Sequence, residues 1–136
     1  MASTIEKVKS QSEKLKDFLA IAFNNYTSSQ LEEAEKLYNE AKTFAEEIQD
    51  ADSLHKAYLG LAKISMPRGH FDVVVENINN ALTIASSLGM KREEASCLNI
   101  LGIALSNLGD FSNSLTNYFG ALNIARELDN KKLQSQ

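Results

Sequence analysis

The residue types that most often carry out chemistry are scarce in this chain of 136 residues. It contains two histidines, His55 and His70, and a single cysteine, Cys97. Neither histidine lies at a metal-ligand spacing from the cysteine, and His70 falls at a predicted turn. Cys97 stands among apolar residues on a predicted helix, where a small buried thiol is commoner than a nucleophile. We therefore expect neither a metal site nor a cofactor.

A cluster of carboxylates is the other group that could do chemistry. Its members are Glu32, Glu33, Glu35, Glu40, Glu46 and Glu47. Paired carboxylates can act as general acid and base. Lys36 and Lys42, however, are interspersed at helical distances, which is typical of a solvated and ion-paired helix face. Since no phosphate-binding glycine loop or nucleophile elbow occurs either, an enzyme is the weakest hypothesis for this sequence.

The sequence repeats itself at a shift of 40 residues, so the elements that position its side chains come in copies. Residues 56–95 laid over residues 96–135 match at many places: Leu61 with Leu101, Gly69 with Gly109, Phe71 with Phe111, Ala81 with Ala121 and Ile84 with Ile124. The same shift backward is weaker but still pairs Ala22 with Ala62 and Ala41 with Ala81. Three copies, over about 4–50, 52–89 and 91–129, fill almost the whole chain.

Each copy predicts two antiparallel helices. In the third copy, apolar residues from Leu98 to Leu105 recur at helical spacing and indicate a helix over about 91–108. Gly109 and Asp110 then suit a helix end followed by a helix start, and a second apolar stripe runs to about 128. In the first copy Ser29 replaces the loop glycine and forms a capping-box pattern with Glu32. Small residues, at Ala22, Ala62 and Gly102, should let the paired helices approach closely.

Composition and charge narrow the class further. The chain is 43% hydrophobic but only 7% aromatic and has one proline, which suits a single helical domain over residues 1–136. Its formal net charge of −4 argues against nucleic acid and anionic membranes as partners. No apolar run is long enough for a membrane span or a signal core, so we expect a cytoplasmic location.

These features resemble the tetratricopeptide repeat over the segment from about Lys16 to Asn130. The resemblance depends mainly on Leu101-Gly102, on Gly109 to Phe111, on Tyr118 and on Ala121. The family's usual repeat is about 34 residues, whereas the longer helices here resemble the 40-residue variant of bacterial regulatory proteins, and the usual proline after the second helix is missing. The resemblance implies an all-α fold, a right-handed superhelical solenoid of three antiparallel helix hairpins.

In that family the first helix of each hairpin lines a concave groove. The residues of these helices that the core does not use are Lys16, Leu19, Phe23, Tyr26, Lys56, Leu59, Lys63, Met66, Ser96, Asn99, Ile103 and Ser106. Their mixture of apolar, amide and lysine side chains favours an acidic or amphipathic peptide. The alternative is that the lysines are ordinary solvated residues and that the apolar side chains complete the core.

Two details bear on the ligand. A carboxylate clamp of the kind that grips chaperone tails would need lysine and asparagine where Leu19 and Phe23 stand, and lysine at Ser96, so that function is disfavoured. Asn99 matches the position at which related long-repeat adaptors hold a peptide backbone, because an amide both donates and accepts. A surface asparagine bound to water is the competing interpretation.

The last predicted helix presents Leu115, Phe119 and Leu122, where the first copy has Glu35, Asn39 and Lys42. Such an apolar end predicts either a longer protein, with Lys131 beginning another repeat, or self-association as a homodimer. The sequence therefore favours a non-catalytic protein-interaction module that binds a partner segment in its groove, and the resemblance implies a regulatory or sensory region of a larger bacterial signalling protein. The alternative is a homo-oligomerisation or assembly element that acts through the C-terminal hairpin.

Overall fold

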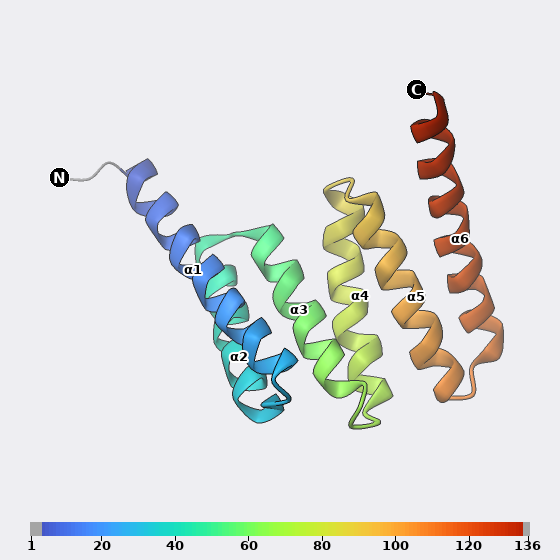
Figure 1. The fold of residues 1–136 in the computed structure, drawn as a ribbon, viewed down its shortest axis with the longest axis horizontal. Helices are drawn as coiled ribbons and strands as arrows, with labels where there is room; N and C mark the ends of the chain where they lie inside the picture. The colour runs from blue at the N-terminus through green and yellow to red at the C-terminus, as the bar shows by residue number, and fades with distance from the viewer. Residues whose placement is uncertain (1–3, 135–136) are drawn as a thin grey trace.

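The computed structural model describes residues 4–134, except for the side chains of residue 5 and residues 7–9. Over that range the chain consists of six α-helices with no strand, so the predicted all-α fold is confirmed (Figure 1). The helices are α1 (Thr4–Thr27), α2 (Leu31–Ile48), α3 (Ala51–Ser65), α4 (Phe71–Ser87), α5 (Lys91–Asn107) and α6 (Phe111–Gln134). They form three hairpins that correspond in order to the three copies of the repeat.

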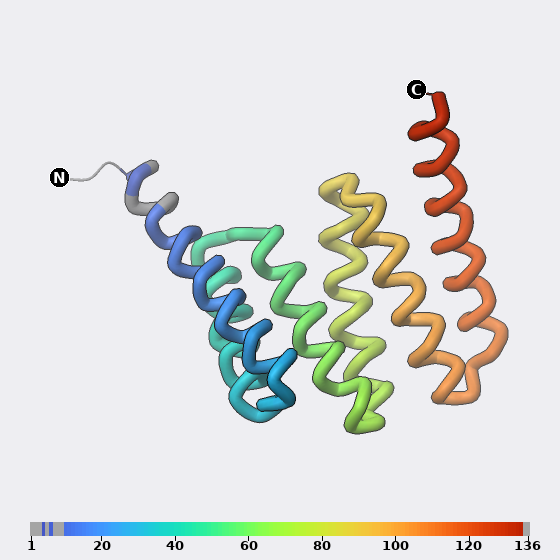
Figure 2. Tube along the Cα trace, viewed as in Figure 1, coloured from blue at the N-terminus to red at the C-terminus, as the bar shows by residue number. Residues whose placement is uncertain are grey.

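The hairpins stack side by side into a solenoid, and the trace runs up and down along its length (Figure 2). Each helix packs against the helix that follows it in the sequence. The first helices of the first two hairpins, α1 and α3, also pack against each other, whereas α3 and α5 do not come as close. One wall of the stack is therefore made by α1, α3 and α5.

Tight turns with a residue at positive φ end most of the helices. Gly69, Gly89 and Gly109 have φ values of 75°, 68° and 86°, a conformation in which a side chain is strained. In the first copy Ser29 adopts the same conformation, with φ of 63°, and the cap of α2 is Gln30 without a side-chain hydrogen bond. The predicted capping box is therefore wrong, because Ser29 takes the place of the loop glycine. Asp110 does cap the last helix, since its Oδ1 accepts a hydrogen bond of 3.3 Å from the backbone N–H of Asn113.

Within residues 4–134, two hydrophobic clusters that meet at α3 form most of the interior. The first joins α1, α2 and α3 around Leu15 and Ile64, and the second joins α3, α4 and α5 around Ile78 and Leu101. Because α3 contributes to both clusters, the hairpins are coupled by continuous packing, as in other repeat arrays. The predicted small residues are buried, and a Cβ on Gly102 would lie 2.7 Å from Cε1 of Tyr118.

The last helix departs from the repeat. The 40-residue shift predicts a turn near residues 129–130, but α6 continues without a break to Gln134. In the second copy α4 ends at Ser87 and Gly89 takes the left-handed conformation in the turn that follows, whereas the third copy has Asp129 at that position and lacks this glycine. Lys131 and Lys132 also favour a continuing helix, because cations stabilise the last helical turn. The prediction that Lys131 begins another repeat is therefore wrong.

Candidate functional site

The histidine and cysteine side chains have structural surroundings. Within residues 4–134, no three side chains of the metal-binding types gather closely enough to hold an ion. His55 is buried, and its Nδ1 lies 2.9 Å from the carbonyl oxygen of Ala81, so it fastens α3 to α4. Its Nε2 has no hydrogen-bond partner in the described part of the chain. The sequence did not indicate this contact, because nothing in the pattern of a single helix shows which neighbouring carbonyl a polar side chain will reach.

Cys97 is fully buried in the second hydrophobic cluster, as the sequence predicted. Burial raises the pKa of its thiol to about 11, and the negative charges of Glu93 and Glu94 add to the shift. A neutral, enclosed thiol is a poor nucleophile, because the thiolate is the reactive form. The structure gives Cys97 the environment of a core residue.

This burial predicts a loss of stability in alkali. Well below pH 9 the thiol is protonated in both the folded and the unfolded chain, but between pH 9 and about 11 it ionises mostly in the unfolded chain. Raising the pH through that window should therefore lower the free energy of unfolding, by up to about 2–3 kcal/mol from this group. Urea denaturation at several pH values should show a shallower decline for Cys97→Ala than for the wild type. Equal declines would contradict the assignment.

A pocket between α1 and α3 brings together most of the predicted groove residues. Its volume is about 360 Å³. Seven of the predicted residues line it, namely Lys16, Leu19, Phe23, Tyr26, Lys56, Leu59 and Lys63. Ala20, Tyr38 and Gly60 complete the lining, and none of these three was predicted. The pocket is thus mainly an apolar and aromatic hollow whose charged lining residues are all lysines.

Tyr38 reaches the floor of this pocket from α2, because Gly60 leaves room for its ring. A Cβ on Gly60 would lie 2.4 Å from Cε1 of Tyr38, so the ring rests directly on the backbone of α3. Burial, and to a smaller extent the neighbouring Tyr26, raises the pKa of the Tyr38 hydroxyl. The hydroxyl therefore stays neutral at physiological pH and presents a hydrogen-bonding group without a charge.

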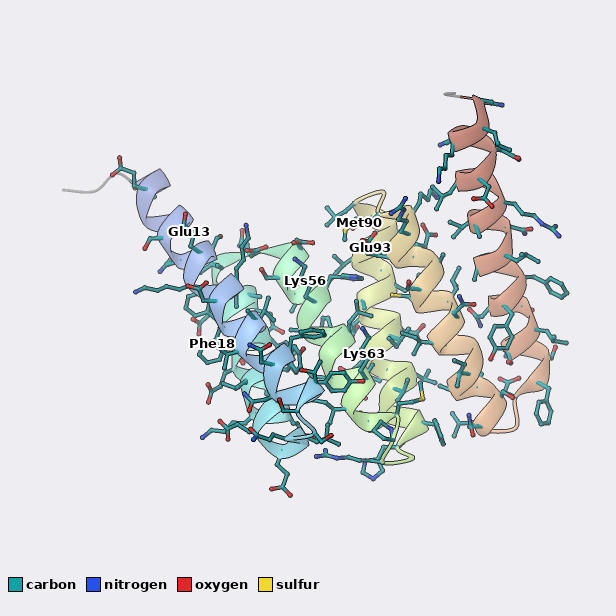
Figure 3. The ribbon with its side chains drawn as sticks, in the orientation of Figure 1. Glu13, Phe18, Lys56, Lys63, Met90 and Glu93 are labelled. Atoms are coloured by element: carbon teal, nitrogen blue, oxygen red, sulfur yellow. The ribbon has the colours of Figure 1, made fainter. Side chains whose placement is uncertain are left out.

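A second depression of about 360 Å³ lies between α3 and α5. It is lined by Leu59, Lys63, Arg92, Glu93, Ser96, Asn99 and Ile100. Leu59 and Lys63 line both hollows, so the two form one groove across α1, α3 and α5. Figure 3 shows Lys56 and Lys63 on α3 and Glu93 on α5, along this wall of the stack. The sequence missed Arg92 and Glu93 because they lie in the first turn of α5, before Ser96, the first residue predicted for the groove on this helix.

Four predicted groove residues have other surroundings than expected. Leu19 is only 7% exposed and belongs to the first hydrophobic cluster, although its edge lines the pocket. Its placement outside the core was therefore wrong. Met66 packs against the second cluster instead of lining either hollow. Ile103 and Ser106 lie further along α5, beyond the depression that contains Asn99.

The groove is positively charged although the chain as a whole is negative. Lys16, Lys56 and Lys63 line the first pocket, and no acidic side chain among the described residues lines it. Lys56 forms an ion pair of 3.2 Å with Asp52, one turn earlier on α3, which neutralises part of its charge. In the second hollow Glu93 offsets Arg92. The strongest positive field should therefore lie between Lys16 and Lys63, over the apolar pocket.

The residues predicted for self-association lie on the solvent-exposed face of the last helix. Leu115, Phe119 and Leu122 are all exposed on α6, at the end of the stack. They do not line the groove hollows described above, so the two candidate surfaces are separate.

Comparison with known proteins supports the fold. No protein-family model matches the sequence, and no curated protein matches it. The structure is similar to the TPR domain of Arabidopsis FLU, with a TM-score of 0.77 and 16% identity over 86% of this chain and 98% of that one. It is also similar to BtubC from P. vanneervenii, with a TM-score of 0.68 and 23% identity over 94% of this chain. The chain spans 59% of the length of BtubC.

These similarities define the class of fold, a tetratricopeptide-like repeat solenoid, as the sequence resemblance predicted. None of the six described helices has both the length and the apolar character needed to cross a membrane.

Proposed function

We propose that this chain is a non-catalytic protein-interaction module that binds an acidic or amphipathic peptide segment along α1, α3 and α5. The observation that supports it best is the pocket between α1 and α3, whose lining combines apolar and aromatic side chains with three lysines and contains no acidic side chain. Tetratricopeptide-like solenoids offer extended concave surfaces suited to such segments. The similar structures share the fold on which this proposal depends.

The lining suggests how a peptide would be held. An apolar side chain of the peptide would enter the pocket beside Phe23 and rest on Tyr38, while carboxylates on either side would meet Lys16 and Lys63. The amide of Asn99 stands in the adjoining hollow, where it can donate to and accept from a peptide backbone. A segment with alternating acidic and apolar residues satisfies all of these positions.

The sequence resemblance extends this proposal to the cellular setting. A groove of this type would serve as the cytoplasmic regulatory or sensory region of a larger bacterial signalling protein. The open reading frame beyond Gln136 tests that part of the proposal, because an output domain encoded there would support it and a stop codon would contradict it.

Charge reversal in the groove should abolish most of the peptide binding. The probe is a fluorescent peptide of alternating glutamate and leucine, with a lysine–leucine peptide as its counterpart, and binding is followed by fluorescence anisotropy. Lys63→Glu should weaken binding of the acidic peptide about tenfold or more, because Lys63 lines both hollows. Asn99→Ala should weaken it less, with a change in stability below about 1 kcal/mol.

Lys36→Glu is the matched control, since Lys36 is an exposed lysine on α2 that lines neither hollow. Lys36→Glu should bind the acidic peptide as the wild type does. Added salt should weaken peptide binding by both the wild type and this variant. Equal binding of the acidic and basic peptides, or equal losses in Lys63→Glu and Lys36→Glu, would contradict an electrostatic role for the groove.

A further inference from the structure

The outer face of α6 is more apolar and more exposed than that of any preceding second helix. Phe111 is 64% exposed and Phe119 is 60% exposed, and Leu115 and Leu122 complete the stripe. The opposite face of α6 buries Ser114, Ala121 and Ile124 against the rest of the stack. The stripe therefore lies away from the face of α6 that is buried in the hairpin.

The end position in the stack explains only part of this exposure. Phe71, Val75 and Leu82 of the second copy, equivalent to Phe111, Leu115 and Leu122, are partly buried against the second hydrophobic cluster. The position of Phe119 is different. Asn39 and Asn79, which correspond to Phe119, are exposed although further hairpins follow them. An added repeat would therefore leave position 119 in solvent, so the phenylalanine there indicates a contact of another kind.

The charge pattern points to the occupant of this face. No charged residue occurs between Phe111 and Ala125 of α6, whereas α2 is rich in glutamate and lysine and α4 contains Asp72 and Glu76. Interface centres are depleted in charge in the same way. Two copies of a chain with net charge −4 repel each other, and an uncharged face is where they can approach at the smallest electrostatic cost.

The stripe is also nearly symmetric about its own centre. Phe111 and Leu122 lie at its ends, and Leu115 and Phe119 lie between them at almost equal distances from the midpoint. Rotating one helix by a two-fold axis through that midpoint would place each phenylalanine opposite a leucine of the other helix. Over about 18 Å of helix, this arrangement pairs the larger side chains with the smaller ones throughout.

From these observations we propose that the Phe111–Leu122 face of α6 binds the same face of a second copy of this chain, in an antiparallel two-fold dimer. The dimer leaves the groove on α1, α3 and α5 open, so it does not depend on peptide binding. A parallel pair is disfavoured, because it would place Arg126, which follows the stripe on the same face of α6, beside its own copy.

Sedimentation velocity over a range of protein concentrations tests the proposal. The mass of the wild-type chain should rise from 15.0 kDa toward twice that value with concentration. Phe119→Glu should weaken self-association about tenfold or more. Ile21→Glu, at a 51% exposed isoleucine on α1, is the control and should associate as the wild type does. A wild-type chain that stays monomeric, or equal effects of the two substitutions, would overturn the proposal; circular dichroism checks that both variants fold.

A mixing experiment tests the orientation. Leu115→Lys and Phe119→Glu should each be monomeric alone, because each places charges against apolar side chains. In an antiparallel pair, mixing the two variants sets the introduced lysine opposite the introduced glutamate at one site and leaves the native leucine–phenylalanine pair at the other, so a heterodimer should form. A parallel pair contains no such combination, and a mixture that stays monomeric would rule out the antiparallel arrangement.

Discussion

Replacing Gly60 by leucine should lower the free energy of unfolding by about 3 kcal/mol. A Cβ at this position would lie 2.4 Å from Cε1 of Tyr38, and the ring is itself buried between α2 and α3. The added side chain must therefore displace either the ring or the helix, since the tightly packed interior leaves little room for a shift. Urea denaturation followed by circular dichroism measures the change.

Two comparisons isolate the clash. Gly120→Ala is the matched control in another helix, because its Cβ would meet only the tip of Leu98 at 3.2 Å, a flexible atom that can move. This substitution should cost less than about 1 kcal/mol, since alanine also favours the helix. In a Tyr38→Ala background, Gly60→Leu should lose much of its effect. Additive losses in the double variant would show that Gly60 and Tyr38 do not act on each other.

The same substitution should affect the proposed binding site. Gly60 and Tyr38 form the floor of the pocket between α1 and α3, so a leucine there would fill the hollow that we assign to an apolar side chain of the peptide. The glycine thus has two roles, one in the packing of α2 against α3 and one in the depth of the groove.

The repeat predicted the hairpins well because the forces that define them are local. Apolar spacing within a helix and glycine at a turn depend only on neighbouring residues, and these features located the helices and the turns at Gly69 and Gly109. Ser29 shows the limit of this reasoning. Its side chain suits a helix cap, but the preceding helix needs a left-handed residue at that place, and that requirement prevails.

The groove was predicted less completely because its depth depends on how helices from different hairpins approach each other. Residues of each predicted face line the two hollows, but helical spacing does not show where along that face a hollow opens. The close approach of α1 to α3 buries Leu19, and the hollow beside α5 ends before Ile103. Tyr38 was missed for the same reason, since it enters the site from a second helix through the space above Gly60.

Replacing Ile78 by alanine should lower the free energy of unfolding by about 3–4 kcal/mol. Ile78 is fully buried in the cluster that joins α3, α4 and α5, so truncation removes apolar contacts and leaves a cavity between two hairpins. Val73→Ala is the control on the same helix. Val73 is 37% exposed, so Val73→Ala should lower the free energy of unfolding by about 1 kcal/mol or less. Equal losses would contradict the assignment of Ile78 to the core.

Ile78→Ala should also lower the local stability of some hairpins more than that of others. Among the described helices, α5 and α6 pack only against each other and against α4, so a weakened second cluster leaves the last hairpin with no other support. The first cluster, around Leu15 and Ile64, does not include Ile78 and should keep α1 and α2 folded. In a stack with contacts only between neighbours, hydrogen exchange should therefore accelerate most in residues 91–134 and least in the first hairpin. Uniform acceleration would show instead that the three hairpins unfold as one cooperative unit.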